Sequence, residues 1–199
     1  MPAVQFRLSH PPSPPRPGDL DEARRQVEAA DLVGAEQELV RGRTLAFVEA
    51  HPDALWRTCV AGHLTGSAVV VDPAGGRIVL LHHRKLDRWL QPGGHADGNG
   101  DLAGVALREA EEETGLADLR VVTPAVDLDI HTIPARGEEP AHLHLDLRFV
   151  VLAPPDARPV VNDESHDVRW VAEEDLDRYG AADELRRLVR RGLDVASRF

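Results

Sequence analysis

Apolar and polar residues divide the chain into a proline-rich start, a helical region and a region of strands. Residues 1–18 hold six prolines, which fix φ and remove backbone donors, so an extended, flexible tail is predicted there. From Asp19, apolar residues are scattered among helix formers up to residue 50, and either Asp19 or Asp21 suits the helix N-cap. We therefore expect one or two helices, within an N-terminal helical extension over residues 19–60.

Residues 61–199 contain the predicted strands and are expected to form one domain. Residues 67–71 and 77–82 are apolar and flank a turn-forming stretch, which predicts a hairpin. Residues 126–131 and 142–149 alternate strictly, so each strand should have one apolar and one polar face. Two shorter elements complete the pattern: a strand at 168–171 and a helix at 183–195. The mixture predicts an α/β (α+β) fold.

The polar faces of the two alternating strands carry titratable side chains. If the strands pair antiparallel, one register places Asp129 opposite His144. That register would gather four more polar side chains on the same surface: His131, His142, Asp127 and Asp146. We expect this surface to contribute to a substrate pocket or to a dimer interface, and the alternative is a solvated sheet face.

Composition and charge narrow the class of protein. The chain has 199 residues, of which 42% are hydrophobic and 29% charged, as in a soluble globular protein. A formal charge of -11 argues against tight binding to a nucleic-acid polymer, because that binding needs Lys and Arg on the phosphates. No apolar run approaches the roughly 20 residues of a membrane-spanning helix. A lone cysteine, Cys59, excludes an intrachain disulfide, and the first residues lack the apolar core of a signal peptide, so a cytoplasmic location is expected.

The candidate chemistry lies in a glycine-rich loop and the helix that follows it. Residues 93–101 include four glycines and are predicted to be a loop. Residues 102–114 are predicted to form a helix, with Asp101 as its N-cap and Gly115 as its C-terminal stop.

Three glutamates of that helix share one stripe of its surface. Glu109, Glu112 and Glu113 are spaced i, i+3 and i+4, so their carboxylates converge. Carboxylates on adjacent turns repel one another unless a cation lies among them, and hard oxygen ligands suit Mg²⁺ or Mn²⁺. The alternative is that they are simply a solvated, acidic helix face.

The loop and helix together resemble the signature of the Nudix hydrolases. That signature is Gly, five residues, Glu, seven residues, then Arg-Glu-apolar-any-Glu-Glu-any-Gly-apolar. The chain supplies Gly94 and, in the correct register, REAEEETGL at residues 108–116. It departs from the signature at Gly100, where the first glutamate is expected, and whether the neighbouring Asp101 replaces that carboxylate is left open. The resemblance covers roughly residues 66–171.

The resemblance implies a mixed β-sheet sandwiched between helices and the hydrolysis of a diphosphate linked to a further group. One to three Mg²⁺ or Mn²⁺ ions would activate water for in-line attack on phosphorus. Carried over residue by residue, Glu112 and Glu113 would be metal ligands and Glu109 a ligand or the general base. Arg108 would hold Glu109 in place, and the backbone carbonyl of Gly93 would complete the coordination.

Five residues outside the signature's charged segment are candidates for substrate binding. His95 follows the glycine pair, and Arg84 is a basic residue shortly before it. Glu164 lies in a later loop, from which Nudix enzymes recruit a further acid. His142 and His144 come from the polar strand face described above. For each of them, the alternative is an ordinary exposed position.

Two other functions compete with a diphosphate hydrolase. A non-catalytic module that binds a nucleotide or metabolite and regulates a partner fits the loss of a glutamate at Gly100. Isopentenyl diphosphate isomerases resemble the chain in their Gly-His pair, but they need a cysteine where this chain has Gly93. No downstream motif selects a substrate, and the N-terminal helices are expected either to cover the pocket or to build a homodimer.

Overall fold

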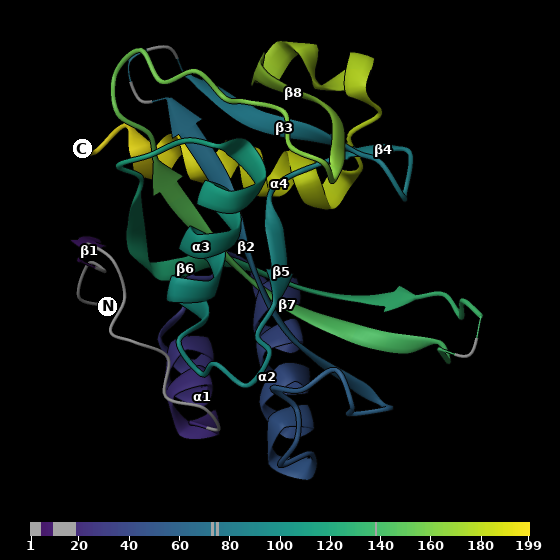
Figure 1. Ribbon diagram of the computed structural model, residues 1–199. Helices are drawn as coiled ribbons and strands as arrows, with labels where there is room; N and C mark the ends of the chain where they lie inside the picture. Colours follow the sequence, from purple (N-terminus) through teal and green to yellow (C-terminus); the bar gives the residue numbers. More distant parts are fainter. Residues whose placement is uncertain (1–4, 10–18, 73, 75, 138) are drawn as a thin grey trace.

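A mixed β-sheet of eight strands lies between helices in the computed structural model, which describes residues 5–9, 19–72, 74, 76–137 and 139–199 (Figure 1). The strand order is β1-β6-β7-β2-β3-β4, while β5 pairs with β2 and β8 pairs with β3. β2 and β7 run parallel, and the other paired strands run antiparallel. None of the helices in the described residues is long and apolar enough to cross a membrane.

The elements have the following bounds. The strands are β1 (Arg7–Ser9), β2 (Gly62–Asp72), β3 (Arg77–His83), β4 (Arg88–Leu90), β5 (Gly93–His95), β6 (Arg120–Ile133), β7 (His142–Leu152) and β8 (Ser165–Ala172). The helices are α1 (Leu20–Ala29), α2 (Ala35–Ala50), α3 (Leu102–Thr114) and α4 (Asp183–Ala196), with a 3-10 helix η1 (Glu173–Tyr179) before α4.

The predicted helix ends are confirmed where the sequence supplied a capping residue. The side chain of Asp19 accepts a hydrogen bond from the backbone of Glu22 at the start of α1. At the start of α3, the side chain of Asp101 accepts a hydrogen bond from the backbone amide of Gly104 at 3.1 Å. Gly115 ends α3 in the left-handed conformation, with φ of 65°, which a residue without a Cβ adopts at little cost.

The two faces of the sheet carry separate apolar cores. Phe149 and Val151 of β7 face the core shared with α1, α2 and α3, whereas Val150 and Leu152 face the core shared with α4. This division follows from the alternation of side chains along a strand. Figure 1 shows α3 and α4 on opposite faces, so the predicted sheet sandwiched between helices is confirmed.

The predicted register of β6 and β7 is wrong by two residues. His131 lies opposite His144, and Asp129 lies opposite Asp146 rather than opposite His144. The turn fixes this register, because Arg136 and Glu139 exchange two backbone hydrogen bonds at its tip. A shift of two residues preserves the face of every side chain, so the predicted set of polar residues still shares one face.

That polar face is buried along much of its length, and the alternative of a solvated face is wrong. Asp127 and Asp146 are each 2% exposed, and Arg148 between them is 5% exposed. Arg148 donates to Asp146, Asp129 and Asp127 over 2.8, 3.0 and 3.3 Å. Burial alone would lower the pKa of Arg148, but the three carboxylates outweigh it and raise that pKa. Arg187 of α4 binds the other side of Asp127, at 2.6 Å.

Two predicted boundaries in the sheet change. β2 begins at Gly62 rather than at residue 67, and residues 93–95 of the predicted loop form the strand β5. β5 pairs with the middle of β2, so β2 and β3 pair only at Val71–Ile78 and Asp72–Arg77. The hairpin is therefore present, but its strands separate to admit β5.

The prediction of a flexible tail over residues 1–18 falls largely on residues 1–4 and 10–18, which lie outside the described residues. Within the described part, Arg7–Ser9 form β1, which pairs antiparallel with β6 at the edge of the sheet. No alternation of apolar and polar residues indicates this strand, because three residues are too few to show a period.

A buried glutamine fastens α2 to β6 and provides a test of the packing. Gln37 is 4% exposed; its Nε2 donates to the Leu128 carbonyl at 2.9 Å, and its Oε1 accepts from the Leu128 amide at 3.0 Å. Gln37→Leu is expected to lower the free energy of unfolding by about 2 kcal/mol, because both backbone groups lose their partner. Urea denaturation measures the loss. Glu36→Leu, at an exposed position one residue earlier, is the control, and equal values for the two variants would contradict the prediction.

Candidate active site

Arg108 connects two of the predicted metal ligands on α3. Its Nη2 lies 2.7 Å from Oε1 of Glu109, and its Nη1 lies 3.1 Å from Oε2 of Glu112. The Glu109 side chain is 15% exposed and that of Glu112 is 59% exposed, so the pair reaches from the interior of the site to its rim. The ion pair between Arg108 and Glu109 is the contact through which Arg108 could orient that carboxylate.

Glu113 is the most buried of the three carboxylates. It is 7% exposed, and its Oε2 accepts a hydrogen bond from the amide of Gly93 at 2.9 Å. Burial raises the pKa of Glu113 to about 7, and the charges of Glu109, Glu164 and Glu112 add to the effect against the opposing hydrogen bond from Gly93. Burial also raises the pKa of Glu109, although Arg108 opposes it. Negative charge at this site therefore exceeds the positive charge that the chain provides.

The glycine pair of β5 is required by close packing on both of its faces. A Cβ at Gly94 would overlap the carboxylate of Glu109, and a Cβ at Gly93 would overlap the side chain of Ser67 on β2. Successive residues of a strand point to opposite faces. The Glu109 carboxylate therefore lies against the face of β5 that is turned to α3. The side chain of Ser67, which is paired with Gly93 in the sheet, points to the opposite face.

The donors on α3 fit a hard divalent cation in kind. Glu109, Glu112 and Glu113 offer only oxygen, as does the carbonyl of Gly93, and Mg²⁺ and Mn²⁺ prefer such ligands. The three carboxylates are not drawn together, because the Arg108 guanidinium lies between Glu109 and Glu112. Among the described residues, the groups with ligand atoms within 4.8 Å of one another are two others: His63, His95 and His144, and His51, Asp53 and Cys59.

The N-terminal extension occupies the place of the missing carboxylate. A Cβ at Gly100 would overlap the backbone oxygen of Asp19, so no larger residue fits there while α1 is in place. Asp101 next to it accepts from Nε2 of Gln26 at 2.9 Å, in addition to capping α3, while Oε1 of Gln26 accepts from the amide of Ala103. Asp101 is thus engaged in joining α1 to α3.

The loop before β8 reaches the carboxylates. Asn162 donates to the backbone carbonyl of Glu112 at 3.1 Å, and the charge of Glu164 contributes to the raised pKa of Glu113. Arg84 bonds to this loop: its amide donates to the Glu164 carbonyl and its Nη2 to the Ser165 carbonyl, each at 2.9 Å. Glu164 and Arg84 therefore lie together at one border of the site.

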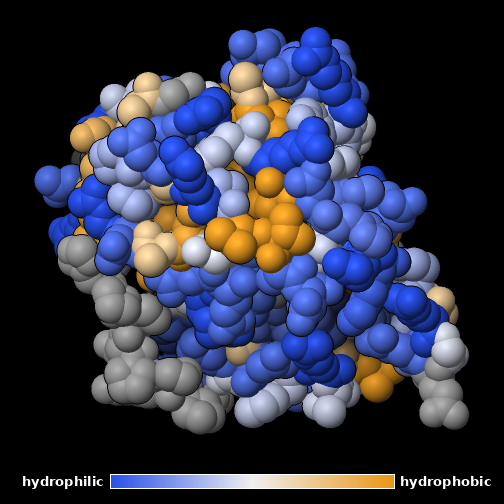
Figure 2. Space-filling model, turned by 45° about the horizontal axis from the view of Figure 1, so that its top comes forward, coloured by the Kyte–Doolittle hydropathy of each residue, from blue (hydrophilic) through white to orange (hydrophobic). Residues whose placement is uncertain are grey.

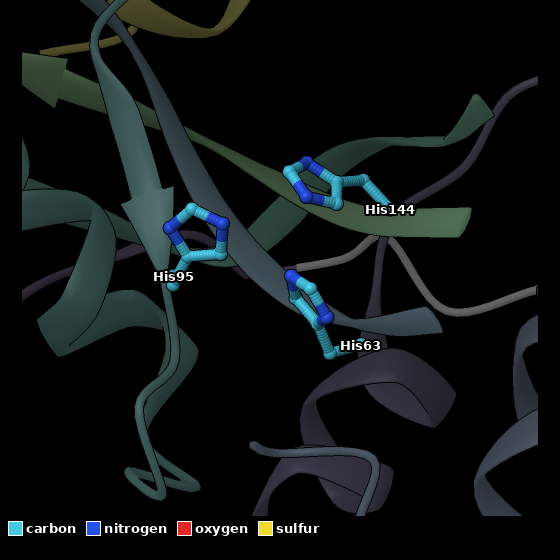
Figure 3. Close-up of side chains that lie close together, drawn as sticks. All are labelled: His63, His95 and His144. Carbon is cyan, nitrogen blue, oxygen red and sulfur yellow. The ribbon is translucent and has the colours of Figure 1, made fainter. Parts of the chain in front are cut away.

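The other three substrate-binding candidates belong to a histidine cluster on the opposite face of β5. The ring centroids of His95 and His144 lie 5.0 Å apart, and both rings lie beside the ring of His63 (Figure 3). His63 was not among the residues that the sequence pattern indicated. His142 stacks on His63 at 5.0 Å. The two groups meet at β5, where Nη2 of Arg108 donates to the backbone carbonyl of His95 over 3.5 Å.

A groove in the described part of the chain lies away from these carboxylates. Its volume is about 690 Å³, and it runs between α1, β1 and β6, with Arg7, Arg25 and Gln26 in its lining. Figure 2 shows a mostly hydrophilic face with an apolar patch near its middle. A patch of this kind is common on monomeric proteins and by itself indicates no partner.

Comparisons with known proteins agree with the resemblance. The model of the NUDIX domain family matches residues 62–192. A search of curated proteins finds no match. A C. elegans Ap4A hydrolase has a TM-score of 0.54 and 20% identity, over 68% of this chain and 98% of that one. The E. coli dihydroneopterin triphosphate pyrophosphohydrolase has a TM-score of 0.56 and 15% identity, over 66% and 95%.

A NUDIX-family hydrolase from Clostridium perfringens is similar to the same degree, with a TM-score of 0.50 and 24% identity over 67% of this chain and 97% of that one. Identities this low show a shared fold and leave the substrate open. The family match covers well over half of the chain, and α3 carries Arg108, Glu109, Glu112 and Glu113 in the order of the signature. The chain therefore belongs to the NUDIX domain family.

Proposed function

We propose that the protein is a Mg²⁺- or Mn²⁺-dependent hydrolase that cleaves a pyrophosphate linkage in a nucleoside diphosphate derivative or a similar organic diphosphate. The observation that carries the proposal is the excess of buried negative charge on α3. Glu113 and Glu109 are held close to the backbone of β5 with pKa values raised by burial, and Arg108 pairs with Glu109. Such a site favours a bound cation.

Different residues of the chain are assigned to metal binding and to proton transfer. A divalent ion held by Glu112, Glu113 and the carbonyl of Gly93 would neutralise charge on the diphosphate and lower the pKa of a bound water. Glu109 takes a proton from the attacking water, whose oxygen bonds to phosphorus while the bond from phosphorus to the bridging oxygen breaks. The raised pKa of Glu109 suits a general base, and the 2.7 Å ion pair with Arg108 fixes its orientation.

Arg84 and Glu164 are proposed to border the substrate. They lie on the carboxylate side of the site, where Arg84 offers a cation for a phosphate and Glu164 a further acid. His95, His142 and His144 lie on the other face of β5 and suit a different ligand.

The competing function is a non-catalytic module that binds a nucleotide or metabolite. The observation in its favour is at Gly100, where the N-terminal extension replaces a carboxylate of the signature. Isomerase chemistry is disfavoured by packing as well as by residue type. A cysteine at position 93 would overlap Ser67 of β2.

Turnover distinguishes the hydrolase from the module. The purified chain is incubated with Mg²⁺ or Mn²⁺ and a panel of dinucleoside polyphosphates, nucleotide sugars, other nucleoside diphosphate derivatives and nucleoside triphosphates. Phosphate is measured after a phosphatase step. We expect turnover of at least one class, reduced by about 100-fold or more in Glu112→Gln.

Glu111→Gln is the matched control, because Glu111 lies on the same helix and is exposed. It is expected to retain the turnover of the unaltered chain. Metal binding without hydrolysis of any member of the panel would support the module instead. An equal loss in Glu111→Gln and Glu112→Gln would remove the assigned role of Glu112.

A further inference from the structure

Three histidines from three strands meet at one place in the sheet. His63 lies opposite His144 in the parallel pair of β2 and β7, and His95 is brought beside them because β5 pairs with β2 at Thr65. The ring centroids are 4.7 Å apart for His63 and His144, and 5.0 Å apart for each of the other two pairs. Figure 3 shows the three rings arranged around a common space.

The central imidazoles are buried without hydrogen-bond partners. His63 is 2% exposed, and neither its Nδ1 nor its Nε2 has a partner among the described residues. Nε2 of His144 is buried and unpartnered as well. Buried polar atoms in folded proteins nearly always have partners, and an ion is one of the standard explanations where they do not.

The protonation state of the cluster is that of a metal ligand. Burial lowers the pKa of His63 and of His95 to about 4 and that of His144 to about 2. The rings also lower one another's pKa, since two neighbouring positive charges repel. At neutral pH the imidazoles are therefore uncharged, and each can offer a nitrogen lone pair.

The donor set differs in kind from that on α3. The cluster offers nitrogen only, which suits Zn²⁺, Co²⁺ or Ni²⁺ better than Mg²⁺. The ligand nitrogens of His63, His95 and His144 all lie within 4.8 Å of one another. Three nitrogens about 2.1 Å from a tetrahedral zinc ion lie roughly 3.4 Å apart, so small side-chain rotations complete the site.

Neighbouring side chains support the outer side of the cluster. His142 stacks on His63, and its Nδ1 lies 3.0 Å from the carbonyl oxygen of Pro140. His131 meets His144 edge to face, with a centroid distance of 5.4 Å, and its Nδ1 lies 2.9 Å from Oδ2 of Asp129. Such contacts limit the rotation of the rings, as outer contacts do around metal ligands.

We propose that His63, His95 and His144 form a second metal site, which binds one Zn²⁺ or a similar borderline divalent cation. The three protein ligands leave the fourth tetrahedral position for water or for an oxygen of a bound anion. The site is separate from the carboxylates of α3. Gly94 presents its Cα to the Glu109 carboxylate on one face of β5, and the side chain of His95, the next residue, lies on the other face. The site does not depend on the proposed hydrolase activity.

Metal titration of the full chain, purified without a histidine tag and freed of metal by chelation, tests the proposal. Zn²⁺ binding is followed by calorimetry and Co²⁺ binding by its visible absorption. We expect one ion per chain, a tetrahedral Co²⁺ spectrum, and a midpoint of thermal unfolding that rises with Zn²⁺. His95→Gln and His144→Gln are each expected to weaken binding at least tenfold and to remove the thermal shift.

Two control variants distinguish binding at this site from binding at a surface histidine or at the carboxylates of α3. His166→Gln, at an exposed position on β8, should bind Zn²⁺ as the unaltered chain does. Glu112→Gln should also retain this binding, and excess Mg²⁺ should not displace Co²⁺. Unchanged affinity in both cluster variants, loss of binding in Glu112→Gln, or no saturable binding of either ion would overturn the proposal. Circular dichroism of the metal-free variants confirms that they are folded before the titration.

Discussion

Replacing Arg148 by methionine is expected to lower the free energy of unfolding by about 3–5 kcal/mol, the usual cost of removing one partner from a buried ionic network. Arg148 is 5% exposed and bonds to three carboxylates. Without it, Asp146 keeps the hydroxyls of Thr65 and Ser67, each at 2.8 Å, but no cation. A buried charge that lacks an opposite charge is what makes the loss large.

Chemical denaturation at pH 7 and near pH 4 measures this effect. Burial raises the pKa of Asp127, so the loss should shrink at the lower pH, where protonation of Asp127 removes part of the uncompensated charge in the variant. Arg187→Met is the matched control: it removes the second arginine from Asp127, but the Arg187 side chain is 33% exposed. Its cost should be about 1 kcal/mol or less. Equal losses in the two variants would contradict the importance assigned to burial.

Gly100→Ala is expected to cost about 2–3 kcal/mol. The added Cβ would overlap the backbone oxygen of Asp19, and a backbone atom cannot rotate away as a side chain can. The N-terminal end of α1 must shift, which strains the contact of Gln26 with Asp101. Gly100→Glu, which restores the family's glutamate, should destabilise the protein to a similar degree because the overlap already begins at Cβ.

Urea denaturation gives the loss, and limited trypsin digestion shows whether α1 is released, because trypsin cleaves at the exposed Arg24 and Arg25 only when the helix around them unfolds. Gly42→Ala is the control within α2, since a Cβ there meets nothing within 4 Å. That change should stabilise the protein by about 0.5–1 kcal/mol. If Gly100→Ala were as stable as the unaltered chain, the contact between Asp19 and the loop would not be fixed in solution.

Local signals in the sequence predicted α3 in full. Its bounds, its N-cap at Asp101 and its C-cap at Gly115 all follow from short-range chemistry that packing does not override. The shared faces of β6 and β7 were predicted for the same reason, since a period of two is visible within one strand. The roles assigned to Glu109, Glu112 and Glu113 remain predictions.

Contacts between distant segments were beyond the reach of these signals. The register of β6 and β7 depends on the bonding of the turn between Arg136 and Glu139, which no pattern of polarity encodes. His63 was missed because its place beside His144 depends on the parallel pairing of β2 with a strand about 80 residues later. Likewise, the absence of a glutamate at Gly100 has a physical reason only once Asp19 is seen against it.

The parallel pair also constrains the order in which the protein can assemble during synthesis. β2 leaves the ribosome long before β7, and until β7 follows, the side of β2 that pairs with it has unsatisfied amide and carbonyl groups along ten residues. Open strand edges of this kind pair readily with other chains. A nascent chain that stalls between α3 and β7 is therefore the species most exposed to aggregation, and chaperones would bind it in preference to the finished protein.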